Sequence, residues 1–370
     1  MKDFIPLMSP DIRSSDIKSV NKVLKSGMLV QGKEVVCLEN SISKYLNVKH
    51  SIAVSSGTAA LHLALITLGI GKGDEVIVPA FSYIATANVV EIVGAKPVFV
   101  DIDIETFTIE TSLIEKVITP KTKAIMPVHE FGLTANMQKI KEIADKNSLY
   151  IIEDAACALG AKDNNVFAGA IGEIACFSFH PRKTITCGEG GLITTNNDSI
   201  AKKLKQLRNH GIEFINDKME FVVPGFNYRM TDFQASILNS MFERFDDIIS
   251  FKAYLSGLYN EKINNPLVKR PTVPKNKIHS WQTYHLLLND KLHQKKIIDL
   301  LNRKGIGSNY GAQCIPEQYY YKKKYNLDVN YLFPNATKAY NFGLAIPLFE
   351  KLNEENIDYI SNTINNFIKI

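Results

Sequence analysis

The chain has 370 residues, 45% of them hydrophobic, and a formal net charge of +5. This length suits a large α/β domain plus a smaller one, and the mild charge gives no reason to expect a nucleic-acid partner. The five cysteines are odd in number and widely spaced, which fits neither a C-x-x-C metal pattern nor a secreted disulfide framework. With no signal-peptide core and no apolar run long enough to span a bilayer, we expect a cytoplasmic protein without metal or membrane contact.

Short β-branched runs alternate with helical stretches between residues 51 and 195. We expect seven strands, at residues 52–54, 75–78, 97–100, 123–128, 150–153, 175–179 and 192–194. We expect helices between the first five strands, at residues 58–68, 85–93, 112–118 and 137–146. Apolar strands separated by helices predict an α/β fold with a mainly parallel, seven-stranded sheet that helices cover on both faces. Ligands of such sheets bind at the carboxyl ends of the strands.

The remaining chain predicts a second, smaller α+β domain. A helix near 200–208, a loop at 216–224 and a helix at 231–245 that continues towards 258 lead to it. The domain itself offers a strand at 284–288 and helices at 291–304 and 353–368. We expect residues 1–25 to form an arm and helix packed on the small domain, 26–245 the large domain, and 246–370 the linking helix and the small domain.

A small-residue turn follows the first strand, in the segment Ser55-Ser-Gly-Thr-Ala-Ala-Leu61. Gly57 allows a tight turn, so the N–H groups of Gly57, Thr58 and Ala59 are expected to face an anion at the positive end of the next helix. Such turns also serve close packing alone. The segment matches neither G-x-G-x-x-G nor the Walker pattern, so it predicts a phosphate site without indicating a nucleotide.

Two consecutive carboxylates, Glu153 and Asp154, end the fifth predicted strand. Side chains alternate along a strand, so one of the two must face the ligand edge of the sheet. It could cap the next helix, bind a metal or pair with a buried cation. Capping is common, and no cluster of histidines and acids surrounds the pair, so a metal site is not expected.

Lys183 follows the apolar strand 174–179, and Tyr83 follows the second strand at the same edge. Burial would favour the neutral amine of Lys183, the form that attacks carbonyl groups. Most lysines at strand ends are solvated surface residues, and an aromatic such as Tyr83 could be core or a stacking platform. Together, however, a phosphate cradle, a flat aromatic, a strand-end carboxylate and a late lysine are what pyridoxal phosphate requires.

The chain resembles the DegT/StrS type of pyridoxal-phosphate sugar aminotransferases, of fold type I, over nearly its whole length. The motifs that carry the resemblance are Ser55-Ser-Gly-Thr-Ala-Ala-Leu61, Glu153-Asp-Ala-Ala156, Ser178-Phe-His-Pro-Arg-Lys183, Gly188-Glu-Gly-Gly191, Arg208-Asn-His-Gly211 and Gly225-Phe-Asn-Tyr-Arg-Met-Thr-Asp232. The resemblance implies that Lys183 forms the Schiff base and shuttles the proton, that Asp154 pairs with the pyridinium nitrogen, and that Tyr83 stacks on the ring.

The same resemblance implies how the rest of the cofactor is bound. Gly57, Thr58 and Ser178 would bind its phosphate, and Asn227 would reach that phosphate from the other subunit of a homodimer with composite sites. Cys157 stands where the family often has glutamine or histidine near the phenolic oxygen.

Two other departures concern the substrate. Many members continue with Arg-Asp where this chain has Ile212-Glu213, and members that act on nucleotide sugars often carry His-Tyr-x-Pro-x-His where this chain has 313–318, Gln-Cys-Ile-Pro-Glu-Gln. Arg229 and Gln313 are the expected substrate-binding residues, Arg229 because a guanidinium binds phosphate oxygens in bidentate fashion.

We therefore expect a transaminase that moves the amino group of L-glutamate to a nucleotide-linked keto sugar, for surface-glycan or related carbohydrate biosynthesis. A small phosphorylated ketose such as dihydroxyacetone phosphate is the alternative acceptor. The family's dehydratases have histidine in place of the lysine, so Lys183 argues against that activity. A non-catalytic, cofactor-binding regulator is the remaining alternative.

Overall fold

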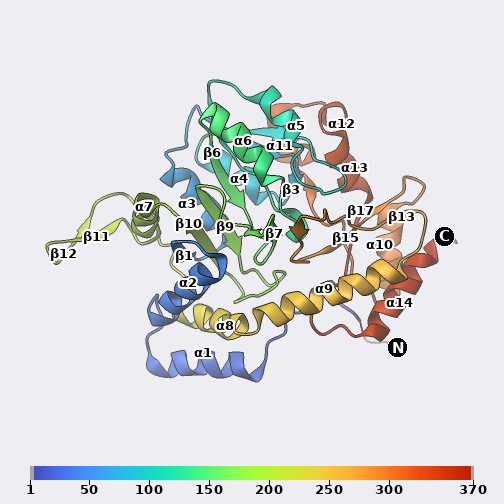
Figure 1. Cartoon of the computed structure of the whole chain (residues 1–370), viewed down its shortest axis with the longest axis horizontal. Helices are drawn as coiled ribbons and strands as arrows, with labels where there is room; N and C mark the ends of the chain where they lie inside the picture. The colour runs from blue at the N-terminus through green and yellow to red at the C-terminus, as the bar shows by residue number, and fades with distance from the viewer. Residues whose placement is uncertain (1–3, 368–370) are drawn as a thin grey trace.

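The computed structural model describes residues 4–367, and a seven-stranded sheet forms its centre (Figure 1). The strand order is β1-β10-β9-β6-β5-β2-β4, and all strands run parallel except β10, which is antiparallel to both neighbours. The strands are β1 (His50–Val54), β2 (Glu75–Pro79), β4 (Lys96–Val100), β5 (Thr122–Ile125), β6 (Tyr150–Asp154), β9 (Ile174–Ser178) and β10 (Gly191–Thr195). The expected α/β fold with its mainly parallel sheet is confirmed.

Helices cover both faces of this sheet, as the alternation of its apolar side chains requires. Ile52 and Ile193 pack on one face with α3 (Gly57–Thr67), α4 (Ala85–Ile92) and α7 (Asp198–Arg208). Ala53 and Leu192, their chain neighbours, pack on the other face with α2 (Lys33–Leu46) and α8 (Asp232–Phe242). On that second face, α6 (Met137–Asn147) covers the other half of the sheet. In the chain, α6 follows α5 (Thr111–Ile114) and a 3-10 turn at Glu115–Val117.

The small domain is built on a second core around an antiparallel sheet. The sheet consists of β13 (Val268–Lys269), β15 (Tyr284–Leu288) and β17 (Gly343–Ile346). The long helix α9 (Phe245–Lys262) runs from the large domain to this core, where it meets α10 (Gln294–Arg303) and α14 (Glu354–Asn365) (Figure 1). Of the expected C-terminal helix 353–368, residue 368 lies outside the described residues.

Short elements complete the fold. They are β3 (Phe81–Ser82), β7 (Lys162–Asp163), β8 (Val166–Phe167), β14 (Lys277–Ile278), β16 (Gln313–Cys314), α11 (Tyr319–Tyr325), α12 (Val329–Leu332), α13 (Pro334–Phe342) and the 3-10 turns Glu130–Gly132 and Ile315–Glu317. Among residues 4–367, no helix is both long enough and apolar enough to cross a bilayer.

The N-terminal segment differs from the expectation. Helix α1 (Ser14–Ser26) packs on α8 of the large domain, not on the small domain. Buried Asp16 receives hydrogen bonds from the Arg244 guanidinium, at the break between α8 and α9. Only the preceding arm reaches the small domain, where Ile5 pairs with Ile306 and joins its core. The boundaries at residues 25 and 245 stay a prediction.

A β-hairpin replaces most of the loop that was expected at 216–224. It consists of β11 (Ile212–Ile215) and β12 (Lys218–Phe221), and it projects from the body of the molecule (Figure 1). Asn216 and Asp217 both have positive φ, the geometry of a two-residue hairpin turn that asparagine and aspartate tolerate. The loop expectation was wrong because the turn residues were taken for a whole loop.

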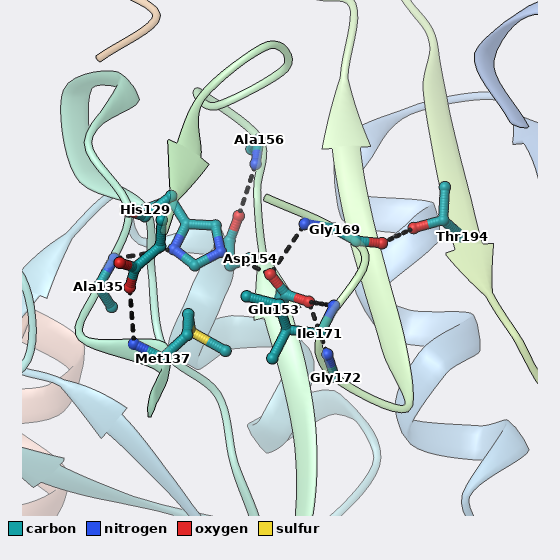
Figure 2. Close-up of polar contacts among 12 residues, drawn as sticks. His129, Ala135, Met137, Glu153, Asp154, Ala156, Gly169, Ile171, Gly172 and Thr194 are labelled. Atoms are coloured by element: carbon teal, nitrogen blue, oxygen red, sulfur yellow. Dashed lines mark hydrogen bonds and ion pairs between the residues drawn. The ribbon is translucent and has the colours of Figure 1, made fainter. Parts of the chain in front are cut away.

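Hydrogen bonds of the Glu153 side chain connect the end of β6 to neighbouring segments (Figure 2). Its carboxylate is fully buried and accepts N–H groups of Gly169, Ile171 and Gly172 at 2.7–2.9 Å. The ring of His129 lies 2.8 Å from it through Nε2, and the other ring nitrogen accepts the N–H of Ala135. Burial pushes the pKa of Glu153 upward, but the bonds from His129 and these amides outweigh burial and hold the pKa below 4.5.

We predict that Glu153→Gln destabilises the protein by about 3 kcal/mol or more, because the new NH₂ group would oppose buried N–H donors. Thermal or urea unfolding at neutral pH measures the loss. Since the pKa of Glu153 is depressed in the fold, its contribution is present above pH 4.5 and is lost as the pH falls through the folded-state pKa. The difference in unfolding free energy between Glu153→Gln and wild type should therefore become smaller in acid.

Glu142→Gln is the matched control, because Glu142 is exposed on α6 and its one ion-pair partner among residues 4–367 is Lys139. Equal, small effects of the two substitutions would contradict the structural role of Glu153.

Candidate active site

A cavity of about 340 Å³ lies at the carboxyl ends of the parallel strands, where the large domain faces the small one. Asp154 at the end of β6, Cys157 after it, Ser178 at the end of β9 and Lys183 all line it. The chain brings them together because parallel strands end at the same edge of a sheet. At the mouth of the cavity Arg182 is exposed to solvent.

The first turn of α3 forms one wall, with Gly57 and Thr58. A side chain at Gly57 would place its Cβ 2.9 Å from the Cβ of Ser178, so glycine is what lets the helix terminus approach β9. The N–H of Ala59 was expected to face an anion. It is not free to do so, because it donates a hydrogen bond to the Ser56 hydroxyl at 3.0 Å. The terminus of an 11-residue helix, beside the Ser178 hydroxyl, suits a bound phosphate.

Asp154 is buried and faces the cavity. One of its oxygens accepts a hydrogen bond from the Thr86 hydroxyl at 2.8 Å. The other accepts the N–H of Ala156 at 3.2 Å (Figure 2). Burial raises the pKa of Asp154, although Thr86, Ala156 and the nearby Lys183 favour its charged form. A protonated ring nitrogen in the cavity would supply the cation that this carboxylate lacks. Asp154 thus has a place in the site beyond capping a helix.

Lys183 lies inside the cavity, and its amine donates a hydrogen bond to the Cys157 sulfur at 3.0 Å. Burial opposes its charge, but Cys157, Asp154 and Glu130 outweigh burial and hold its pKa above the ordinary value. The expectation of a neutral amine was therefore wrong for this arrangement, because three acidic groups share the cavity with the lysine.

A second lysine, Lys252 of α9, is fully buried but does not line this cavity. Its amine donates to the Thr184 hydroxyl at 3.3 Å, and burial lowers its pKa to about 8.

Tyr83 lines the cavity and is 58% exposed, so it is not a core residue. Its ring is available for a flat ligand to stack on, which leaves the stacking role open to test.

Three expected site residues lie outside the cavity of this single chain. Asn227 is exposed, Arg229 donates to the side chain of Asn209, and Gln313 contacts Tyr310. Their roles stay predictions. The exposed position of Asn227 is compatible with binding the cofactor phosphate of a second subunit.

Sequence reasoning missed Glu130, which the structure places in the cavity wall beside Asp154 and Lys183. It also missed Thr86, the partner of Asp154, and the small-domain residues Gln282 and Asn309. No motif marks these positions, since each reaches the site through tertiary packing.

The cavity fits pyridoxal phosphate by its donor set. The cavity lining offers a helix terminus and a hydroxyl for the phosphate, the buried carboxylate of Asp154 for the ring nitrogen, and the amine of Lys183 for a covalent bond.

Comparisons with known proteins agree with this geometry. The model of the DegT/DnrJ/EryC1/StrS aminotransferase family matches residues 10–365. A GDP-perosamine synthase of Caulobacter vibrioides is 43% identical over 75% of this chain and 76% of its own. Another, from Escherichia coli O157:H7, is 35% identical over 98% of both chains.

Among solved structures, the sugar aminotransferase Spr1654 of Streptococcus pneumoniae in its pyridoxal-phosphate form superposes with a TM-score of 0.93. The superposition covers 99% of both chains at 29% sequence identity. The expectation of a non-catalytic regulator has no support in these relationships. The chain belongs to the DegT/DnrJ/EryC1/StrS family and is a pyridoxal-phosphate-dependent aminotransferase.

Proposed function

We propose that the protein transfers the amino group of L-glutamate to the keto group of a nucleotide-linked sugar, for surface-glycan or related carbohydrate biosynthesis. The observation that carries the proposal is the cavity that holds Lys183, Asp154 and the α3 terminus together, in a chain whose relatives include two GDP-perosamine synthases. The cavity reaches the surface, so a nucleotide could extend into solvent while the sugar lies inside. These points favour a nucleotide sugar over dihydroxyacetone phosphate.

Each cavity residue has a proposed task. Lys183 would hold the cofactor through a covalent bond to its amine, and the same amine would move the proton at the reacting carbon of the substrate. Asp154, fixed by Thr86 and Ala156, keeps the ring nitrogen protonated. Pyridoxal phosphate itself supplies an electron sink for the bond-breaking step.

The neighbours of these residues orient and bind. Gly57, Thr58 and Ser178 would donate hydrogen bonds to the phosphate, and Tyr83 would stack on the ring. The Cys157 sulfur, 3.0 Å from the Lys183 amine, orients that amine.

We expect Lys183→Ala to abolish turnover, by roughly 10³-fold or more, because it removes both the covalent bond and the proton transfer. Cofactor should still bind non-covalently through the phosphate cradle and Asp154. Single-turnover absorbance with glutamate and dialysis of the cofactor measure the two effects.

Lys252→Met is the matched control, since it removes a buried lysine outside the cavity and should leave the covalent cofactor in place. A Lys183→Ala enzyme with wild-type turnover would refute the assignment.

We further propose a homodimer with composite sites, in which Asn227 completes the phosphate site of the partner. The β11–β12 hairpin supports a self-associating surface, because Phe214 and Phe221 on it are 71% and 66% exposed. The hairpin immediately precedes the segment of Asn227, so contact between two copies there would bring Asn227 towards the second cavity.

Mixing Lys183→Ala subunits with Asn227→Ala subunits should restore activity. In random dimers half are mixed, each with one intact site, so roughly one quarter of the wild-type rate is expected. The control adds Phe214→Ser and Phe221→Ser to both subunits, which should prevent pairing and recovery. A fully active monomer, measured by light scattering, would rule out the composite site.

The acceptor is tested in reverse, with GDP-perosamine and 2-oxoglutarate as substrates. The proposal predicts that glutamate forms while the amine of the sugar becomes a keto group, as followed by mass spectrometry. If no nucleotide amino sugar reacts but dihydroxyacetone phosphate is aminated by glutamate, the small-ketose alternative is correct. If only unphosphorylated keto acids react, both proposals are wrong.

A further inference from the structure

Glu130 is a buried acid in the wall of the active-site cavity, to which neither the motifs nor the proposed mechanism assigns a task. It follows β5 in the 3-10 turn Glu130–Gly132 and is only 5% exposed. Its carboxyl group lies within electrostatic reach of both Asp154 and Lys183. It is therefore close to the place where the reaction occurs.

The backbone of this turn is held in an unusual conformation. Phe131 has φ = 56°, in the left-handed region that a bulky side chain rarely adopts. The small domain stabilises it, because the Phe131 ring stacks on His285 at 4.2 Å and the N–H of Thr283 donates to the Phe131 carbonyl at 3.2 Å. The Gly132 carbonyl accepts the N–H of Ser280 at 2.9 Å. These contacts fix where the Glu130 side chain enters the cavity.

One oxygen of Glu130, Oε2, is buried and has no hydrogen-bond partner among the residues that the structure describes. A buried polar atom without a protein partner is rare, and an ordered water or a ligand group supplies the missing partner in such places. Burial, and then the charge of Asp154, raise the pKa of Glu130 to about 8, although Lys183, the Phe131 backbone and Ser82 favour ionisation. At neutral pH the carboxyl group therefore retains its proton.

A neutral carboxylic acid is a hydrogen-bond donor, unlike a carboxylate. The carboxylates of glutamate are best bound by a guanidinium, and Arg182 at the mouth of the same cavity offers one. Glu130 is buried and lies within electrostatic reach of Lys183, so an uncharged oxygen of the sugar suits it better than a carboxylate does.

We propose that Glu130 donates a hydrogen bond to the oxygen on the reacting carbon of the sugar acceptor, and so selects for that acceptor. This inference rests on the proposed function, and it adds a residue that distinguishes the sugar from glutamate. Glu130 itself transfers no proton in this role, because the acid binds the oxygen and keeps its proton.

The protonation state is tested by thermal unfolding of the holoenzyme and of Glu130→Gln. The folded protein keeps a proton on Glu130 that the unfolded chain loses above pH 4.5, so wild-type stability falls as the pH rises from 4.5 to about 8. Glutamine cannot ionise, so the melting temperature of Glu130→Gln should rise relative to that of wild type between pH 4.5 and about 8. A constant gap would show that Glu130 is ionised in the fold and would overturn the proposal.

Glu189→Gln is the control for this measurement, because Glu189 lines the same cavity but is exposed. The difference in melting temperature between Glu189→Gln and wild type should stay constant over the same pH range.

The acceptor role is tested by separating the two half-reactions through the absorbance of the bound cofactor. Glu130→Leu should slow the half-reaction with GDP-perosamine by roughly tenfold or more, because the keto oxygen that forms on the reacting carbon in this direction loses one buried hydrogen bond. The half-reaction with glutamate should change far less. Glu130→Gln keeps an N–H donor, so it should retain more of the sugar reaction than Glu130→Leu and lose the wild-type decline above about pH 8.

Equal losses in both half-reactions would overturn the acceptor assignment. If wild type does not react with GDP-perosamine at all, the proposed sugar function fails separately. The melting comparison then still decides whether Glu130 is protonated in the fold, and a constant difference would overturn the proposal.

Discussion

The site depends on the alternation of side chains at the end of β6. Glu153 and Asp154 are consecutive, so their carboxylates must point to opposite sides of the strand. Glu153 is held by His129 and three backbone amides inside the fold, whereas Asp154 keeps only two bonds and faces the cavity. The bonds of Glu153 therefore fix the position of Asp154, whose carboxylate faces the cavity.

Charge balance in the cavity follows from burial. Asp154 and Glu130 share the space with one amine, Lys183, and two buried carboxylates that lie near each other do not both ionise readily. Asp154 has the better hydrogen bonds to its charged form, since Thr86 and Ala156 both donate to it. In the proposed mechanism Glu130 retains the proton, so Asp154 would serve as the counter-ion and Glu130 as the hydrogen-bond donor.

The sequence predicted those features that local pattern determines. All seven strands of the large sheet were expected, because each is a short apolar run, and the cavity residues at strand ends followed from the parallel topology. The partner of α1 and the role of Glu130 were not predictable, because they depend on Arg244 and on the small-domain residues that hold Phe131. Likewise, the raised pKa of Lys183 arises from acids that are distant in sequence.

The central claim is that Lys183 is the lysine that bonds to the cofactor. Borohydride reduction of the purified holoenzyme, followed by peptide mass spectrometry, tests it directly, because reduction makes the bond between lysine and cofactor permanent. The account predicts the mass of the cofactor on the peptide that contains Lys183. Lys252 is the informative competitor, since it is buried and its pKa is lowered to about 8. Modification of Lys252, or of no lysine, would contradict the account.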